Sequence, residues 1–183
     1  MLQGVCRVAF LIAAVTATAT ATGCSQTVTG TAQRSESGVP DAGRSYGYVD
    51  DRCGLLDNSS IQSTLAADEV TRPYSGAVCQ YILSRGTGQQ ATTIDATFSW
   101  FDKGSLQRER DVAAARGAVV TDLVVERHKT FSARRDITGA ACSATAAAGS
   151  GVLSWWVQYR GQTGGDPCAD AEKLLSATLR SDM

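Results

Sequence analysis

The segment from Thr92 to Phe101 reads TTIDATFSWF, and apolar and polar side chains alternate along it. One side of the alternation carries Ile94, Ala96, Phe98 and Trp100. The other side carries Thr93, Asp95, Thr97, Ser99 and finally Phe101, an aromatic residue at the end of a polar row. Successive side chains of a β-strand point to opposite faces of a sheet. The pattern therefore predicts a strand with one buried face and one solvated face.

A second aromatic strand is predicted at Gly151 to Tyr159, which reads GVLSWWVQY. Its apolar row contains Leu153, Trp155, Val157 and Tyr159, and its mixed row contains Val152, Ser154, Trp156 and Gln158. We expect Trp155 in the core. Trp156 stands on the less apolar face, where a large ring is either covered by a helix or offered to a ligand. Trp156 and Phe101 are therefore the candidate residues of a binding surface.

The remaining segments carry strand and helix signals in turn. Further strands are predicted at 77–84, 119–125, 129–135 and 141–145, the last in a hairpin with 151–159. Helices are predicted at 53–67, at about 105–116 and from Asp166-Pro167 onward, where Asp suits the N-cap and Pro the first helical position. Hairpin-like strands with helices at intervals favour a single α+β domain, in which helices pack on an antiparallel sheet.

Composition excludes several classes of protein. Of the 183 residues, 43% are hydrophobic, which is enough for a packed core and excludes a fully disordered chain. The formal net charge of −1 excludes a globally basic nucleic-acid binder, so no nucleic-acid partner is expected. No apolar stretch reaches the ~18–20 residues of a membrane-spanning helix.

The first residues have the pattern of a lipoprotein export signal. Arg7 precedes the apolar run VAFLIAAV at 8–15, and small residues then lead to Ala21-Thr22-Gly23-Cys24. The Cys24 thiol is the nucleophile that would take a thioether-linked diacylglycerol. We expect a signal peptide at 1–23, the acylated Cys24 and a flexible Ser/Thr/Gly-rich tether at 24–46, and a globular domain at 47–183.

An ordinary secretion signal is the alternative interpretation of the same residues. Lipoprotein signals usually have a large aliphatic residue three positions before the cysteine, and here that residue is Ala21. Ala17-Thr18-Ala19 and Ala19-Thr20-Ala21 are small-residue sites that suit cleavage without lipidation.

Four cysteines remain in the expected domain, and an even number in an exported chain indicates disulfides. Cys53, Cys79, Cys142 and Cys168 allow three connectivities, of which two local loops, 53–79 and 142–168, are the simplest. A metal site is not indicated, because the chain has no CxxC motif and one histidine.

Motifs of catalysis are lacking in the sequence. There is no GxSxG nucleophile elbow, and His128 has no motif around it. We therefore expect no enzyme, no metal and no cofactor. Basic residues gather at Arg127-His128-Lys129 and Arg134-Arg135, which predicts either a solvated strand edge or a contact with anionic lipid head groups or cell-wall phosphates.

Several segments follow one another in a characteristic order: CSQTVTGTA (24–32), CGLLD (53–57), VCQYIL (78–83), FSWFDKGSLQRER (98–110), ACSATAAAGSGVLSWWV (141–157) and DPCADAEKLLSATL (166–179). The first resembles the tethers of actinobacterial lipoproteins. From about Cys53 to the C-terminus the chain resembles the LprB/LprC-type lipoproteins of mycobacteria, a domain of unknown function. The resemblance implies a membrane-anchored lipoprotein with Cys24 acylated, and it implies no catalytic residues.

These observations together predict a lipoprotein on the outer face of the cell membrane. We expect a non-enzymatic domain that binds a lipidic or small ligand or an envelope protein. The alternatives are a structural or accessory subunit of an envelope complex and a plain secreted protein. A deep apolar cavity would favour a ligand, and a flat apolar patch would favour a protein partner.

Overall fold

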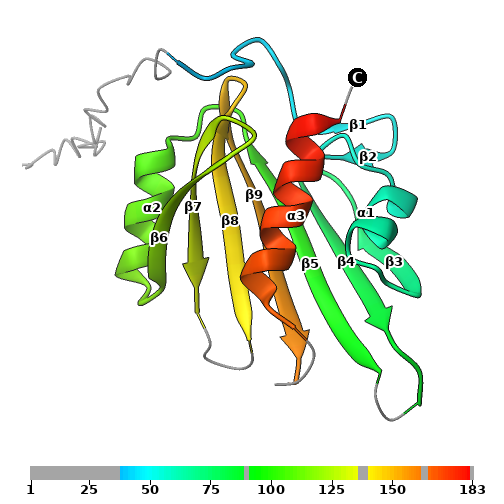
Figure 1. Cartoon of the computed structure of the whole chain (residues 1–183). Helices are drawn as coiled ribbons and strands as arrows, with labels where there is room; N and C mark the ends of the chain where they lie inside the picture. The colour runs from blue at the N-terminus through cyan, green and yellow to red at the C-terminus, as the bar shows by residue number, and fades with distance from the viewer. Residues whose placement is uncertain (1–37, 89–90, 136–139, 162–164, 182–183) are drawn as a thin grey trace, which may run out of the picture. The chain divides into compact units, whose positions relative to one another are not determined.

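A computed structural model describes residues 38–88, 91–135, 140–161 and 165–181 (Figure 1). The expected signal peptide, Cys24 and the first part of the expected tether lie outside these residues. In chain order the described elements are β1 (Tyr48–Val49), β2 (Arg52–Cys53), α1 (Asn58–Thr64), β3 (Glu69–Tyr74), β4 (Val78–Arg85), β5 (Thr92–Phe101), α2 (Leu106–Ala115), β6 (Val119–Val125), β7 (His128–Arg134), β8 (Ala141–Ala148), β9 (Gly151–Arg160) and α3 (Pro167–Arg180). The expected α+β class is confirmed.

Within the described residues, seven strands form one antiparallel sheet in the order β3-β4-β5-β9-β8-β7-β6. β1 and β2 form a separate small hairpin. The central pair is β5 and β9, in which Phe98 lies opposite Trp155 and Thr97 lies opposite Trp156. Residues directly opposite each other share a face, so the two adjacent tryptophans point to opposite faces of the sheet, as the alternation predicts.

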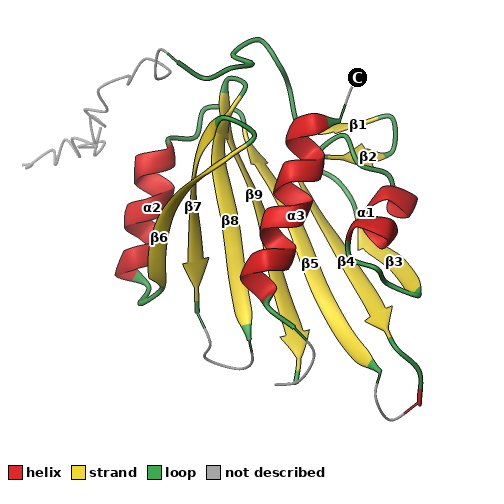
Figure 2. Ribbon diagram, in the orientation of Figure 1, coloured by secondary structure: helices red, strands yellow, loops and turns green. Residues whose placement is uncertain are grey.

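One face of the sheet is covered by α3 and α1, and the core lies beneath these helices (Figure 2). Trp155 is fully buried, with its ring centroid 5.2 Å from that of Phe98. Its indole Nε1 donates a hydrogen bond of 2.9 Å to Thr178 Oγ1 on α3. The other large side chains of this core are Tyr46, Ile61, Leu65, Tyr81, Leu83, Ile94, Leu153, Tyr159 and Leu174. The apolar rows expected in β5 and β9 are therefore the rows that face the core.

The opposite face of the sheet carries α2. Arg110 of this helix forms an ion pair of 2.8 Å with Asp122 of β6. Phe131 and Ala133 of β7 are buried on the same face. Because the main sheet contacts of α2 are with β6, β7 and β8, the helix covers that half of the face.

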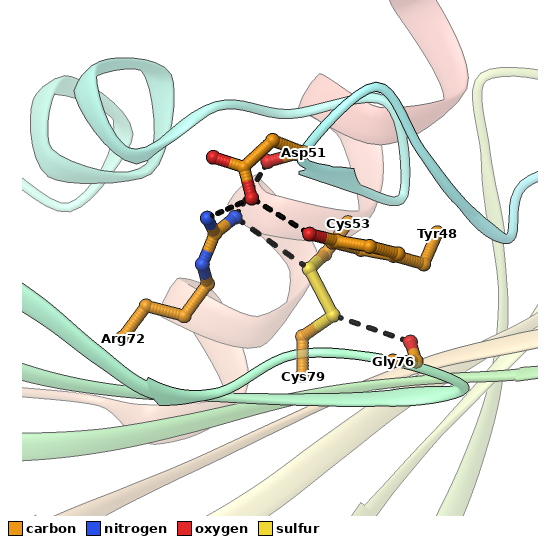
Figure 3. The surroundings of a disulfide bond; sticks show 6 residues. All are labelled: Tyr48, Asp51, Cys53, Arg72, Gly76 and Cys79. Atoms are coloured by element: carbon orange, nitrogen blue, oxygen red, sulfur yellow. Dashed lines mark hydrogen bonds and ion pairs between the residues drawn. A yellow bond between two sulfur atoms is a disulfide. The ribbon is translucent and has the colours of Figure 1, made fainter.

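The first disulfide joins Cys53 of β2 to Cys79 of β4. Beside it, Arg72 of β3 donates hydrogen bonds to the backbone oxygen (2.6 Å) and to Oδ1 (2.5 Å) of Asp51 (Figure 3). The hydroxyl of Tyr48 donates to the same Oδ1 at 2.7 Å. These bonds, first that of Tyr48 and then those of Arg72, lower the pKa of the Asp51 carboxyl. The disulfide and the ion pair together attach the β1–β2 hairpin to the edge of the sheet.

The second disulfide joins Cys142 of β8 to Cys168 in the first turn of α3. Asp166 caps this helix by accepting a hydrogen bond of 3.0 Å from the backbone N–H of Cys168, and Pro167 takes the first helical position. Both expected disulfide pairings are thus confirmed, and in each of them the two cysteines are 26 residues apart in the sequence.

The segment just before β1 packs against the end of the sheet where β8 turns into β9. Tyr46 is fully buried and its hydroxyl donates to the Asp41 carboxylate, which also accepts the backbone N–H of Gly149 at 2.9 Å. Arg44 donates to the backbone oxygen of Ser181, just past α3. Gly149 has a φ of +53°, and a side chain there would collide with the carbonyl oxygen of Arg44. The described end of the expected tether is therefore packed onto the domain.

The expected first helix is wrong at its start. Gly54 and Leu55 have φ values of +60° and +63°, in the left-handed region that a right-handed helix excludes. Cys53 accordingly lies in β2, and α1 begins at Asn58 with Asp57 as its N-cap. The strands expected in the rest of the chain agree with the structure to within three residues at each end.

Truncation of the two tryptophans is expected to have unequal effects on stability. Trp155→Ala should lower the free energy of unfolding by about 3–5 kcal/mol, because it empties a fully buried site. Trp156→Ala should cost clearly less, because its ring is half-buried on the other face. Urea denaturation of both variants measures the difference. Equal, large losses would show that both faces are buried, which contradicts the fold described here.

Candidate binding face

The half of the sheet face beyond α2 is formed by β3, β4, β5 and β9, and we call it the open sheet face. By ladder register it carries Glu69, Thr71, Tyr74, Val78, Gln80, Ile82, Ser84, Thr93, Asp95, Thr97, Ser99, Phe101, Val152, Ser154, Trp156, Gln158 and Arg160, with Ser143 of β8 at its border. It lies opposite the core face, since its residues alternate with the buried rows of the same strands. The structure therefore places both predicted surface residues, Trp156 and Phe101, on one face.

Large apolar side chains on the open sheet face are exposed to solvent. The exposed fractions are 59% for Tyr74, 44% for Phe101 and 38% for Val78. Trp156 is half-buried, between Thr97 on β5 and Ser143 on β8. The helix that shares this side of the sheet, α2, has its main contacts on β6 to β8, and β4, β5 and β9 lie between these strands and the β3 edge.

Tyr74 belongs to the open sheet face and was missed by sequence patterning. It lies on β3, whose sequence EVTRPY does not alternate and contains a proline. A register shift between Thr71 and Tyr74 interrupts the ladder, after which Tyr74 lies opposite Gln80 of β4. Proline and irregular pairing are typical of an edge strand. The sequence signal that could have indicated this edge strand is the proline in the segment just before the alternating strand β4.

The side chains that lie between the aromatic rings on the open sheet face are polar and uncharged, and we call them the floor of this face. Within the described residues, the side chains of Gln80, Thr97, Ser99 and Ser143 make no hydrogen bond to another residue. Their hydroxyl and amide groups therefore remain available to solvent or to a ligand.

One ion pair lies on the open sheet face, among the residues that the structure describes. Arg160 donates two hydrogen bonds of 2.7 Å to the two carboxylate oxygens of Asp95. The hydrogen bonds and the charge of Asp95 raise the pKa of Arg160. The two charges of this pair neutralise each other, and Glu69 of β3, which lies opposite Ser84, adds an exposed carboxylate toward one end of the face.

A buried cluster of ionisable groups lies on the core side of the sheet. Asp170 of α3 is 3% exposed and accepts hydrogen bonds from Lys173 Nζ (2.8 Å), the Tyr159 hydroxyl (2.5 Å) and Arg85 (2.9 Å). Burial opposes ionisation of Asp170, but these three donors outweigh it and lower the pKa of the carboxyl. Burial and the bond to Asp170 raise the pKa of Tyr159 to about 12. The cluster ties α3 to β9 and β4.

An open groove of about 610 Å³ runs between α3 and the β6–β7 turn. Two of its charged side chains pair with each other, since Glu126 lies 3.4 Å from Arg180 and also accepts a hydrogen bond of 2.7 Å from Ser176. Exposed Val124 contributes apolar surface at one side. The groove is a surface feature with mixed lining and is not a deep apolar cavity.

The predicted cluster of basic residues does not form. Arg127 and Lys129 lie at the β6–β7 turn, whereas Arg134 lies at the other end of β7, about 20 Å along the strand. Arg134 forms an ion pair of 3.0 Å with Asp166. His128 is 4% exposed, with Nδ1 2.9 Å from a backbone oxygen of β8. The two groups of basic residues are close in sequence, but they lie at opposite ends of β7 and therefore do not form one cluster.

Among the described residues, no group of three or more His, Cys, Asp or Glu side chains is placed to hold a metal ion. None of the helices in this part of the chain is both long and apolar enough to span a bilayer.

Comparison with known proteins returned one family. A family model described as a protein of unknown function (DUF3558) matches residues 19–181, which is most of the chain. No curated protein and no solved structure matched.

The Asp170 cluster predicts a pH-dependent stability difference. A carboxyl whose pKa is lower in the folded state contributes stability above its unfolded pKa of ~3.9 and loses it as the pH falls through the folded value. Asp170→Asn should therefore lower the free energy of unfolding by about 1.5–3 kcal/mol at pH 7 and by much less at pH 3. Urea denaturation at the two pH values measures both differences.

The matched control for this variant is Asp95→Asn, which breaks the pair with Arg160, whose side chain is 56% exposed. It should cost less stability at pH 7 than Asp170→Asn does, because water screens a pair with an exposed partner. An Asp170→Asn loss that is the same at pH 3 and pH 7 would contradict the lowered pKa.

Proposed function

Because this chain belongs to the DUF3558 family, whose description assigns no function, we propose its function from its own residues. It is an exported lipoprotein of the LprB/LprC type, held at the outer face of the cell membrane through acylated Cys24. Its globular domain is a non-enzymatic binding module that takes a ligand or partner on the open sheet face. The membrane is its first partner, through the lipid.

The N-terminal pattern and the disulfides support export. The apolar run at 8–15 is followed by Ala21-Thr22-Gly23-Cys24, the pattern of a lipid-acceptor cysteine. Two disulfides, Cys53–Cys79 and Cys142–Cys168, are typical of proteins that fold in an oxidising compartment.

The observation that carries the binding role is the open sheet face itself. Tyr74, Phe101 and Val78 are substantially exposed on it, and Trp156 is half-buried beside them. Tyr and Trp side chains are enriched at binding interfaces relative to the rest of a protein surface. The groove beside α3 supports the same preference for binding at the surface rather than in the interior, since it is open and has a mixed polar and apolar lining.

The polar chemistry of the open sheet face supports binding rather than catalysis. Asp95 and Arg160 neutralise each other there. The buried acid Asp170 has its carboxylate occupied by three donors on the other side of the sheet. A structural or accessory subunit is the alternative, and it would use the same face against a protein.

Lipidation at Cys24 is tested by detergent phase partitioning of the full chain expressed in an actinobacterial host. The wild type should enter the detergent phase and carry an acyl mass on Cys24, and Cys24→Ala should move to the aqueous phase. Cys6→Ala is the matched control, because Cys6 lies in the expected signal peptide.

A wild type that partitions into water without an acyl mass would contradict the anchor. A mature N-terminus directly after Ala19 or Ala21 would then identify a plain secreted protein instead.

A further inference from the structure

The open sheet face combines separated aromatic rings with a floor of hydroxyl and amide groups. We propose that it binds a neutral polysaccharide chain in an extended form. This inference rests on the proposed function, because it names the class of ligand that the same face takes.

The three rings are spaced across the sheet. Tyr74 and Trp156 lie in one row perpendicular to the strands, with Gln80 and Thr97 between them. Three strand spacings separate the two rings, or about 14 Å. Phe101 lies four residues along β5 from Thr97, about 13 Å away. A ligand that touches all three rings must therefore be longer than one sugar ring.

The floor between the rings offers hydrogen-bond partners in both directions. The side chains of Gln80, Thr97, Ser99 and Ser143 have no partner among the described residues. Hydroxyl groups both donate and accept, and a glutamine amide does the same through separate atoms. Sugar hydroxyls need this mixture of donors and acceptors along the edge of each ring.

The aromatic rings of the face can contact the apolar side of a sugar. The C–H groups on one side of a pyranose or furanose ring form an apolar surface, and aromatic side chains provide a flat apolar surface of similar extent. Stacking on Trp156 and hydrogen bonding to Thr97, directly opposite on β5, can then act on the same sugar.

The charge of the face disfavours an anionic polymer, because the face carries the ion pair of Asp95 and Arg160 and the exposed carboxylate of Glu69. The ion pair of Asp95 and Arg160 is internally neutral, with both carboxylate oxygens occupied by the guanidinium. An anionic lipid head group, teichoic polymer or nucleic acid would need unpaired basic side chains. Exposed Arg127 lies at the β6–β7 turn, and exposed Lys103 lies in the turn after β5, outside the strands that form the face.

The composition of the face disfavours a protein as the occupant. The cores of protein interfaces are apolar and depleted in serine. On the open sheet face, Ser99 and Ser154 lie directly between the rows of Phe101 and Trp156. The aromatic rings are therefore separate platforms rather than a continuous apolar patch.

The surface is also shaped for an extended chain. The ladders of β4 with β5 and of β5 with β9 run without a register shift, from Val78↔Ser99 to Arg85↔Thr92 and from Thr93↔Arg160 to Phe101↔Val152. An uninterrupted sheet presents an open surface rather than a closed pocket, so a polymer can lie across it without an end entering the protein.

The test is affinity electrophoresis of the full chain, purified in detergent, through native gels that contain soluble mannan, galactan, arabinan or α-glucan. At least one of these neutral polysaccharides should retard the wild type. Trp156→Ala, Tyr74→Ala and Phe101→Ala should each weaken the binding about 2- to 10-fold, and Trp156→Phe should retain more binding than Trp156→Ala. Tyr48→Ala is the matched control, since Tyr48 is 40% exposed but lies on β1, away from this face.

Several outcomes would overturn the proposal. They are no retardation by any of the four polysaccharides, an equal loss in Tyr48→Ala, and stronger binding to an anionic polygalacturonate control. Dimerisation of the wild type that Trp156→Ala abolishes, measured by sedimentation velocity, would also overturn it, because a second copy would then be the occupant.

A second experiment shows whether a negative result means that the ligand is not a polysaccharide or that the open sheet face binds nothing. A photo-cross-linking residue replaces Ser99 in the full chain, and intact cells are irradiated. A cross-link to glycan supports the proposal. A cross-link to protein overturns the polysaccharide but leaves a binding role for the face. The absence of any adduct, with no retardation in the gels, overturns both.

Discussion

The burial of Trp155 beneath α3 is the contact on which the rest of the structure depends. It lies against Phe98 and donates a hydrogen bond to Thr178, and the disulfide from Cys142 to Cys168 fixes the start of the same helix. A slip of one residue in a strand would exchange its two faces and would place Trp156 in the core. The packing of one face of the sheet therefore determines which residues the other face presents.

The two halves of that other face differ in the polarity of their side chains. Phe131 and Ala133 on β7 are apolar and are buried on the half that α2 covers. On β5 the corresponding residues are hydroxyl-bearing, such as Thr97 and Ser99, and such a surface is stable in water without a helix over it. The isolated rings of this half are the exception, since their exposure has a cost that folding alone does not require. Under the proposed function, these rings are the part of the face that contacts a ligand.

The amount that could be predicted differed between elements for physical reasons. β5 and β9 were predicted well because a half-buried antiparallel strand must alternate, and α3 because Asp166-Pro167 is a strong start signal. The start of α1 was not predicted correctly, because the left-handed turn at Gly54 and Leu55 depends on the β1–β2 hairpin and its disulfide. Tyr74 was missed because an irregular edge strand carries no periodic pattern. For the site, the sequence could place single residues on a face but could not show which strands stay uncovered.

Hydroxyl-radical footprinting tests most directly whether the open sheet face is the surface in use. The full chain is oxidised in intact cells and again after purification, and modification of individual residues is measured by mass spectrometry. If the open sheet face binds a ligand in cells, Tyr74, Phe101 and Trp156 should be modified in the purified protein and protected in cells, while exposed Tyr48 should be modified equally in both. Equal modification of the three residues in both samples would contradict this expectation.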